Sequence, residues 1–144
     1  LLLSEMWITA SGRCAPPQNK PTTVELNTCQ PFLEREIELI NPKVFVALGR
    51  IAFDRILRIY NLPKKGYDFG HGVLHQLPKR KWLLASYHPS RQNTQTGRLT
   101  VEMFDAIWQK ARDLIENRSN LGKDDHLPNH VCIPAISNHT DDYE

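Results

Sequence analysis

The segment of residues 43–49 restricts the possible folds of this chain more than any other part of its sequence. Its five central residues, 44–48, are all apolar, and Gly49 follows them. A strand that is apolar at every position, and not only at every second one, has to be covered on both of its faces. The segment therefore predicts a strand inside a parallel sheet, with helices packed on both sides of that sheet.

The segments around this strand carry helical patterns. Thr22 and Glu25 have the spacing of a capping box, in which a hydroxyl and a carboxylate each bind a free amide at the start of a helix. Pro31 is expected to end this helix and to begin a second one, because proline is tolerated in the first turn of a helix and disrupts its interior. Thr100 is expected to cap a last amphipathic helix, in which Trp108 faces the core.

Helices and strands alternate along the chain. We expect a small hairpin arm before the last of three strands, which are predicted at residues 7–10, 43–49 and 82–87. This alternation predicts an α/β fold, a three-layer α/β/α sandwich with a short parallel sheet. Three strands are few for such a sheet, and residue 1 is not methionine, so we expect one or more N-terminal strands of the fold to be missing.

The length of 144 residues suits one domain, which we place at residues 1–116, and residues 117–144 lack periodicity and are expected to form a disordered tail. Neither a run long enough to cross a bilayer nor a signal peptide is present, so we expect an intracellular protein of the cytoplasm or nucleoid without a membrane partner. Between Lys64 and Arg98 there are seven basic residues and one acidic residue. The middle of the chain is therefore a candidate face for a polyanion.

The predicted strand of residues 82–87 leads to His88. Pro89 has no N–H to donate to a strand ladder, so His88 is expected at the carboxyl end of the strand, which is where ligands bind in open α/β sheets. The following loop contains Arg91 and Arg98 and no aliphatic residue before Leu99. We predict that this loop contacts a polar, anionic surface. The alternative is an ordinary surface histidine before a turn.

Cys14 and Cys29 are candidate metal ligands. Two thiols alone complete neither a tetrahedral zinc site nor a cluster that is held by cysteines, so these two would need further ligands. The alternative is a pair of buried structural cysteines.

Four segments with distinctive composition follow one another along the chain: Arg13-Cys14-Ala15-Pro16-Pro17-Gln18-Asn19-Lys20-Pro21, Cys29-Gln30-Pro31-Phe32-Leu33, Lys43-Val44-Phe45-Val46-Ala47-Leu48-Gly49-Arg50 and His88-Pro89-Ser90-Arg91-Gln92-Asn93. Together they resemble the iron-sulfur uracil-DNA glycosylases. Asn19, the segment Phe69-Gly70-His71-Gly72 and residues 93–100 make the resemblance closer to family 5, also called type B, than to family 4. The resemblance covers residues 7–116.

The resemblance implies roles for individual residues. Cys14 and Cys29 would be the third and fourth thiolates of a 4Fe-4S cluster with a structural role. Asn19 would contact the uracil that is flipped out of the duplex, and His88 would donate a hydrogen bond to its O2 atom. The loop that follows would enter the duplex, so we predict DNA contacts for Ser90, Arg91, Gln92, Asn93 and Arg98, with the two arginines holding phosphates.

The function implied by the resemblance is that of a monomeric base-excision repair enzyme, which hydrolyses the N-glycosidic bond of uracil or other deaminated bases in DNA. The acidic residue with which the family activates water, and its first two cluster cysteines, have no counterpart in this sequence. We therefore expect these 144 residues alone to be a weak or inactive glycosylase in which the cluster lacks two of its four ligands. The alternatives are a DNA-binding remnant without catalysis and an unrelated hydrolase that uses Ser86 or Ser90 as its nucleophile.

Overall fold

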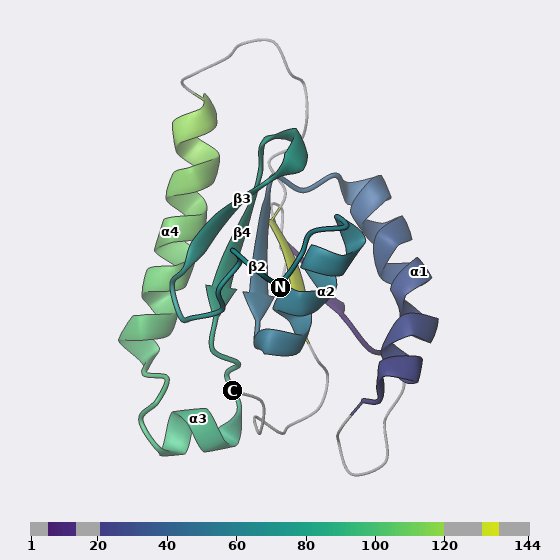
Figure 1. Cartoon of the computed structure of the whole chain (residues 1–144). Coiled ribbons are helices and arrows are strands. Elements are labelled where there is room, and N and C mark those ends of the chain that lie inside the picture. The colour runs from purple at the N-terminus through teal and green to yellow at the C-terminus, as the bar shows by residue number, and fades with distance from the viewer. Residues whose placement is uncertain (1–5, 14–20, 120–130, 136–144) are drawn as a thin grey trace.

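A computed structural model describes residues 6–13, 21–119 and 131–135 of the chain (Figure 1). These residues contain a five-stranded sheet in the order β1-β5-β2-β4-β3. The strands are β1 (Met6–Ala10), β2 (Val44–Leu48), β3 (Leu74–Leu77), β4 (Lys81–Ser86) and β5 (Val131–Ala135). β5 pairs in parallel with β1 and β2, β2 also pairs in parallel with β4, and β3 pairs with β4 in the antiparallel direction. The predicted hairpin arm is therefore present as β3 and β4.

The helices cover the sheet from both sides. They are α1 (Thr23–Ile40), α2 (Arg50–Ile59), α3 (Arg91–Gln95) and α4 (Val101–Ser119). α1 and α2 lie over one face of the sheet, α4 lies over the other, and α3 lies beyond the ends of the strands (Figure 1). This arrangement confirms the predicted three-layer α/β/α sandwich. Within the described ranges, none of the helices combines the length and the apolar character that a membrane span requires.

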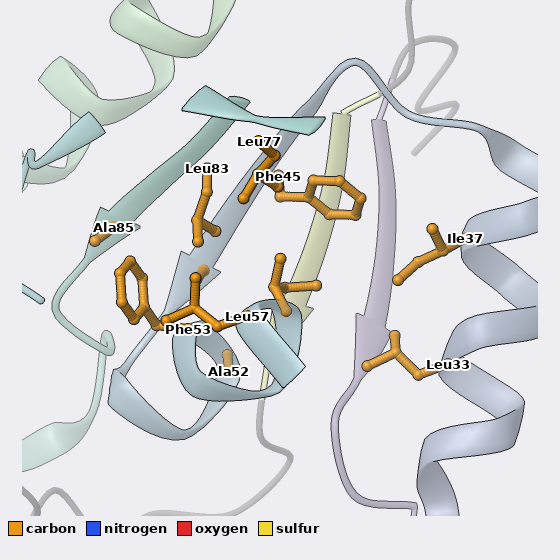
Figure 2. Packing of buried hydrophobic residues seen from close by; sticks show 11 residues of the cluster. Leu33, Ile37, Phe45, Ala52, Phe53, Leu57, Leu77, Leu83 and Ala85 are labelled. Carbon is orange, nitrogen blue, oxygen red and sulfur yellow. The ribbon is translucent and has the colours of Figure 1, made fainter. Parts of the chain in front are cut away.

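The side chains of β2 alternate between two cores. Phe45 and Ala47 face α1 and α2, where they pack in one buried cluster with Leu33, Phe53 and Leu57 (Figure 2). The other positions of β2 belong to a second cluster, which includes residues of α4: Val44, Val46, Leu48, Ile107, Ala111 and Ile115. Each fully buried valine, leucine, isoleucine or phenylalanine in these clusters stabilises the fold by about 1.5–3 kcal/mol. The apolar run of β2 therefore reflects burial on both faces of the sheet.

α1 begins at the predicted capping box and then departs from the prediction. The Thr22 N–H donates to Glu25 Oε2 at 2.7 Å, and the Glu25 N–H donates to Thr22 Oγ1 at 3.2 Å. The expected break at Pro31 is wrong, because one helix runs through this residue. Pro31 is exposed, so water can bind the carbonyl of Asn27 that its missing N–H leaves without an intrahelical donor.

The C-terminal region also differs from the prediction. α4 continues to Ser119, and the residues of β5 form a strand between β1 and β2. The prediction of a disordered tail is therefore wrong for these residues, and the rest of the predicted tail lies outside the described residues. β5 pairs with β1 along five residues and contains Pro134, which weakens the sequence pattern of a strand. Neighbouring strands on both sides supply the pairing that this short segment could not specify alone.

Candidate functional site

The carboxyl ends of β2 and β4 meet at one edge of the sheet, which we call the rim. The last pair of their register joins Leu48 to Ser86. Beyond it, the Gly49 N–H donates to the Ser86 carbonyl at 2.9 Å. α2 begins directly after Gly49, and His88 follows two residues after β4. His88 therefore lies at the carboxyl edge of the parallel sheet, as the sequence predicts.

His88 packs against Gly49. A Cβ atom built on Gly49 would lie 3.4 Å from His88 Cβ and 3.8 Å from His88 Cδ2, at van der Waals distance, so the histidine lies directly beside the Gly49 backbone. Gly49 has φ 93° and ψ 162°, a conformation that is essentially restricted to glycine. The backbone at the end of β2 and the position of His88 are therefore linked through one glycine.

The polar segment after His88 forms α3, where the sequence predicted a loop. Ser90 caps this helix, because its Oγ accepts a hydrogen bond from the Asn93 N–H at 3.2 Å. The Asn93 side chain donates from Nδ2 to the His88 carbonyl at 3.0 Å. Ser90 and Asn93 are 2% and 5% exposed. These two residues therefore shape the segment and bind the His88 backbone. They do not belong to the exposed side chains of the segment.

The exposed side chains of this segment include Arg91, Gln92 and Arg98, three of the predicted DNA contacts. The guanidinium carbon of Arg98 lies 4.8 Å from the centre of the Tyr87 ring, within the range of a cation–π interaction. Arg91 belongs to the first turn of α3. The rim therefore presents two arginines and one amide beside His88, a set that suits contacts with phosphate oxygens.

The proposed cluster ligands are only partly described. Cys29 is buried on α1, and its Sγ accepts a hydrogen bond from the Arg13 N–H at 3.4 Å. Cys14 and Asn19 lie outside the described residues. No group of three or more metal-ligating side chains occurs in the described part of the chain. A 4Fe-4S cluster is usually held by four thiolates, and the sequence has three cysteines, so these 144 residues do not fit such a cluster by themselves.

A cavity of about 460 Å³ lies between α1 and α2, and His88 is not among its lining residues. Arg55 lines this cavity and is buried, with Nη1 donating to Asn27 Oδ1 at 2.7 Å and to Gln30 Oε1 at 3.1 Å. Burial and then the neighbouring charge of Arg58 lower the pKa of Arg55. These contacts join α2 to α1, so we assign Arg55 a structural role.

Sequence reasoning did not identify two features of the rim. The first is the contact between Gly49 and His88, and the second is the bond from the Asn93 side chain to the His88 backbone. The position of Gly49 between a predicted strand and a predicted helix was a usable signal for a backbone that needs glycine. No sequence signal distinguished the buried Asn93 from the exposed polar residues around it.

Comparisons with known proteins agree with the resemblance. The family model described as "Uracil DNA glycosylase superfamily" matches residues 3–112. The chain is 50% identical over 115 residues to a Type-5 uracil-DNA glycosylase of Thermus thermophilus. The matched region covers 79% of this chain and 52% of that protein. It is 44% identical over 117 residues to a Type-5 uracil-DNA glycosylase of Mycobacterium leprae, with coverage of 79% and 51%. A Type-4 uracil-DNA glycosylase of Archaeoglobus fulgidus is 32% identical over 90 residues, with coverage of 60% and 45%. The chain thus spans about half the length of these curated relatives.

Proposed function

The chain belongs to the uracil-DNA glycosylase superfamily, and on this premise we propose that its rim binds uracil-containing DNA and contributes to hydrolysis of the uracil N-glycosidic bond in base-excision repair. The observation that carries the proposal is the position of His88. This residue lies at the carboxyl edge of a parallel sheet, against Gly49 and two residues before Ser90, the cap of α3. Other deaminated bases belong to the same proposed class of substrate.

The chemistry of His88 suits this reaction. Cleavage of the bond leaves negative charge on the departing base and positive charge on the sugar. An imidazole N–H that donates to uracil O2 stabilises the charge on the base more strongly in the transition state than in the ground state. Asn19 is the proposed second contact to the base. His88 and Asn19 are thus the candidate catalytic residues.

α3 suits the extrusion of the base. A flipped base leaves a gap in the duplex, and unstacking it costs a few kcal/mol. α3 begins three residues after His88, and its cap at Ser90 and the bond from Asn93 to the His88 carbonyl hold it in one position. We assign it the role of occupying the gap, while Arg91, Gln92 and Arg98 contact the DNA backbone and Ser90 and Asn93 maintain the shape of the segment.

The activity of these 144 residues alone is expected to be low. By the family resemblance, an acidic residue activates the attacking water, and the sequence has no counterpart of that motif. Removal of one donor to a developing anion lowers a rate by about 100- to 1000-fold, and loss of water activation acts on the same step. The proposal is therefore selective binding of uracil-containing DNA together with slow release of uracil. The cluster adds no step to this mechanism, because the residues present do not complete it.

A comparison of two duplexes tests the proposed function. Binding is measured by fluorescence anisotropy with a duplex that contains one uracil and with a matched duplex that contains thymine, and uracil release is followed under single-turnover conditions. We expect tighter binding of the uracil duplex, slow release of uracil, and a loss of at least about 100-fold in rate for His88→Ala.

The matched control is His75→Ala. His75 is another half-buried histidine, which contacts the Asp68 carbonyl at 2.8 Å, and its replacement should leave uracil release close to the wild-type rate. Equal affinity for the two duplexes without any uracil release would favour the DNA-binding remnant. Fast turnover that does not depend on His88 would show that the catalytic groups lie elsewhere.

The two exposed arginines give a separate prediction. Arg91→Ala and Arg98→Ala should each weaken binding of the uracil and thymine duplexes by the same factor, because phosphate contacts carry no base information. Each lost contact should also reduce the slope of log K against log salt concentration by about 0.9. The control is Arg112→Ala, an exposed arginine of α4 that pairs with Glu116 at 3.2 Å. A preferential loss of binding to the uracil duplex would contradict a phosphate-binding role.

A further inference from the structure

Residues 69–73 lie beside the end of β4 and extend its antiparallel pairing with β3. The Gly72 N–H donates to the Ala85 carbonyl at 2.8 Å, and the Ala85 N–H donates to the Val73 carbonyl at 2.9 Å. Gly72 has a φ of 80°, which favours glycine, and the chain turns there. This turn brings the half-buried side chain of His71 to the backbone of Tyr87, the residue before His88.

Both ring nitrogens of His71 contact backbone groups. The Tyr87 N–H lies 3.2 Å from Nδ1, and the Met103 carbonyl lies 3.1 Å from Nε2. An amide N–H can only donate, so Nδ1 has to accept and carries no proton. A carbonyl can only accept, so Nε2 has to carry the proton. The two contacts together therefore require the neutral ring with its proton on Nε2. A protonated ring would present a donor at each nitrogen and could not accept the Tyr87 N–H.

His71 joins three separate parts of the chain. Its own loop follows α2, Tyr87 follows β4, and Met103 lies in the first turn of α4. The His71 and Tyr87 rings also pack together with their centres 5.1 Å apart. Two cations lie at this junction, because Arg98 lies over the Tyr87 ring and Lys110 donates to the Gly72 carbonyl.

The backbone of Tyr87 and His88 is thus bound by side chains from two other segments. Asn93 binds the His88 carbonyl from the side of α3, and His71 binds the Tyr87 N–H from the side of α4. These two hydrogen bonds flank the peptide that joins Tyr87 to His88. A short segment that is fixed at both ends keeps the side chain between them in a narrow range of positions, which is what a preorganised donor requires.

We propose that His71 is a positioning residue, whose neutral form with the proton on Nε2 holds the Tyr87 backbone and thereby orients His88 toward the flipped base. The effect of His71 on DNA binding rests on the proposed function. The hydrogen-bonding state of His71 can be measured without DNA. His71 does not need to touch the substrate, and its effect passes through the peptide before His88.

NMR spectroscopy of the whole chain tests the assignment directly. Long-range nitrogen–proton spectra at pH 7.5 should show His71 protonated on Nε2 and unprotonated on Nδ1. In His71→Phe, hydrogen exchange of the Tyr87 amide should become faster by about tenfold, the factor expected for one lost hydrogen bond. The amide of Val46, in the middle of β2, should change much less. His71→Asn should restore the protection of Tyr87, because its side-chain oxygen can accept where Nδ1 does.

The matched control is His75→Phe, which removes a histidine that bonds the Asp68 carbonyl and should leave the Tyr87 amide unchanged. With the two duplexes described above, His71→Phe should reduce the preference for uracil over thymine, and His71→Asn should retain it. A proton on Nδ1 in the wild type, or unchanged Tyr87 exchange in His71→Phe, would overturn the positioning role. Equal binding of both duplexes by the wild type without any uracil release would refute the proposed function, while the exchange data would still decide how His71 is bonded.

Discussion

The Gly49→Ala variant is expected to be less stable than the wild type by about 1–3 kcal/mol, because alanine at φ 93° and ψ 162° occupies a strained backbone conformation. The new methyl group would also lie 3.4 Å from His88 Cβ, so relief of the strain shifts either the end of β2 or the histidine. We expect a lower midpoint of urea unfolding with an unchanged slope, and weaker discrimination between the uracil and thymine duplexes.

Gly66→Ala is a matched control for this variant. Gly66 has a similar φ of 90°, and a Cβ atom there would have no atom within 4 Å. Both variants introduce backbone strain, but only Gly49→Ala places an atom against His88. Loss of uracil discrimination in both variants would mean that strain alone is responsible. Wild-type stability of Gly49→Ala would show that the rim backbone is free to relax.

The Asn93→Ala variant is expected to lose about 0.5–1.5 kcal/mol of stability, because the 5% exposed Asn93 side chain no longer donates to the His88 carbonyl, which keeps the Ser90 N–H at 2.8 Å as its donor. Alanine has a higher helix propensity than asparagine, so any loss in α3 has to come from the missing hydrogen bond and from packing. The variant should also show weaker uracil discrimination, since the His88 carbonyl then has one of its two hydrogen bonds from the α3 side. Urea unfolding and the two duplexes measure both effects.

Gln92→Ala is the control for Asn93, because Gln92 is the preceding residue of the same short helix and is exposed. It should retain the stability of the wild type within about 0.5 kcal/mol, as surface substitutions usually do. Equal effects of the two substitutions would contradict a bracing role for Asn93. An Asn93→Ala protein that retains both stability and discrimination would show that the bond from His71 to Tyr87 is sufficient to hold the rim.

Local patterns predicted much of the fold. The apolar run of β2, the capping box of α1 and the cap at Thr100 all appear in the structure where the sequence placed them. These features depend on neighbouring residues only. The break at Pro31 was wrong because packing and solvent contact compensate for one lost hydrogen bond in a long helix. The helical form of α3 was missed because its cap, Ser90, lies in a segment whose composition is typical of loops.

The candidate site was predictable to a similar extent. The position of His88 follows from the end of one strand, which Pro89 marks in the sequence. The distinction between exposed and buried polar residues after His88 does not follow from the sequence, because it depends on where the carbonyl of His88 and the ring of Tyr87 lie. The same holds for His71, whose partners are 16 and 32 residues away.

The sequence by itself determined the layers of this protein and the edge at which its candidate site lies, because both follow from the burial of apolar residues along single strands and helices. Only the tertiary structure decided what holds His88 in place. Gly49, Asn93 and His71 come from three different segments, and each acts on His88 or its neighbour through one specific contact. Such contacts depend on distances between segments that are far apart in the chain, and the packing of the whole sheet and its helices sets those distances.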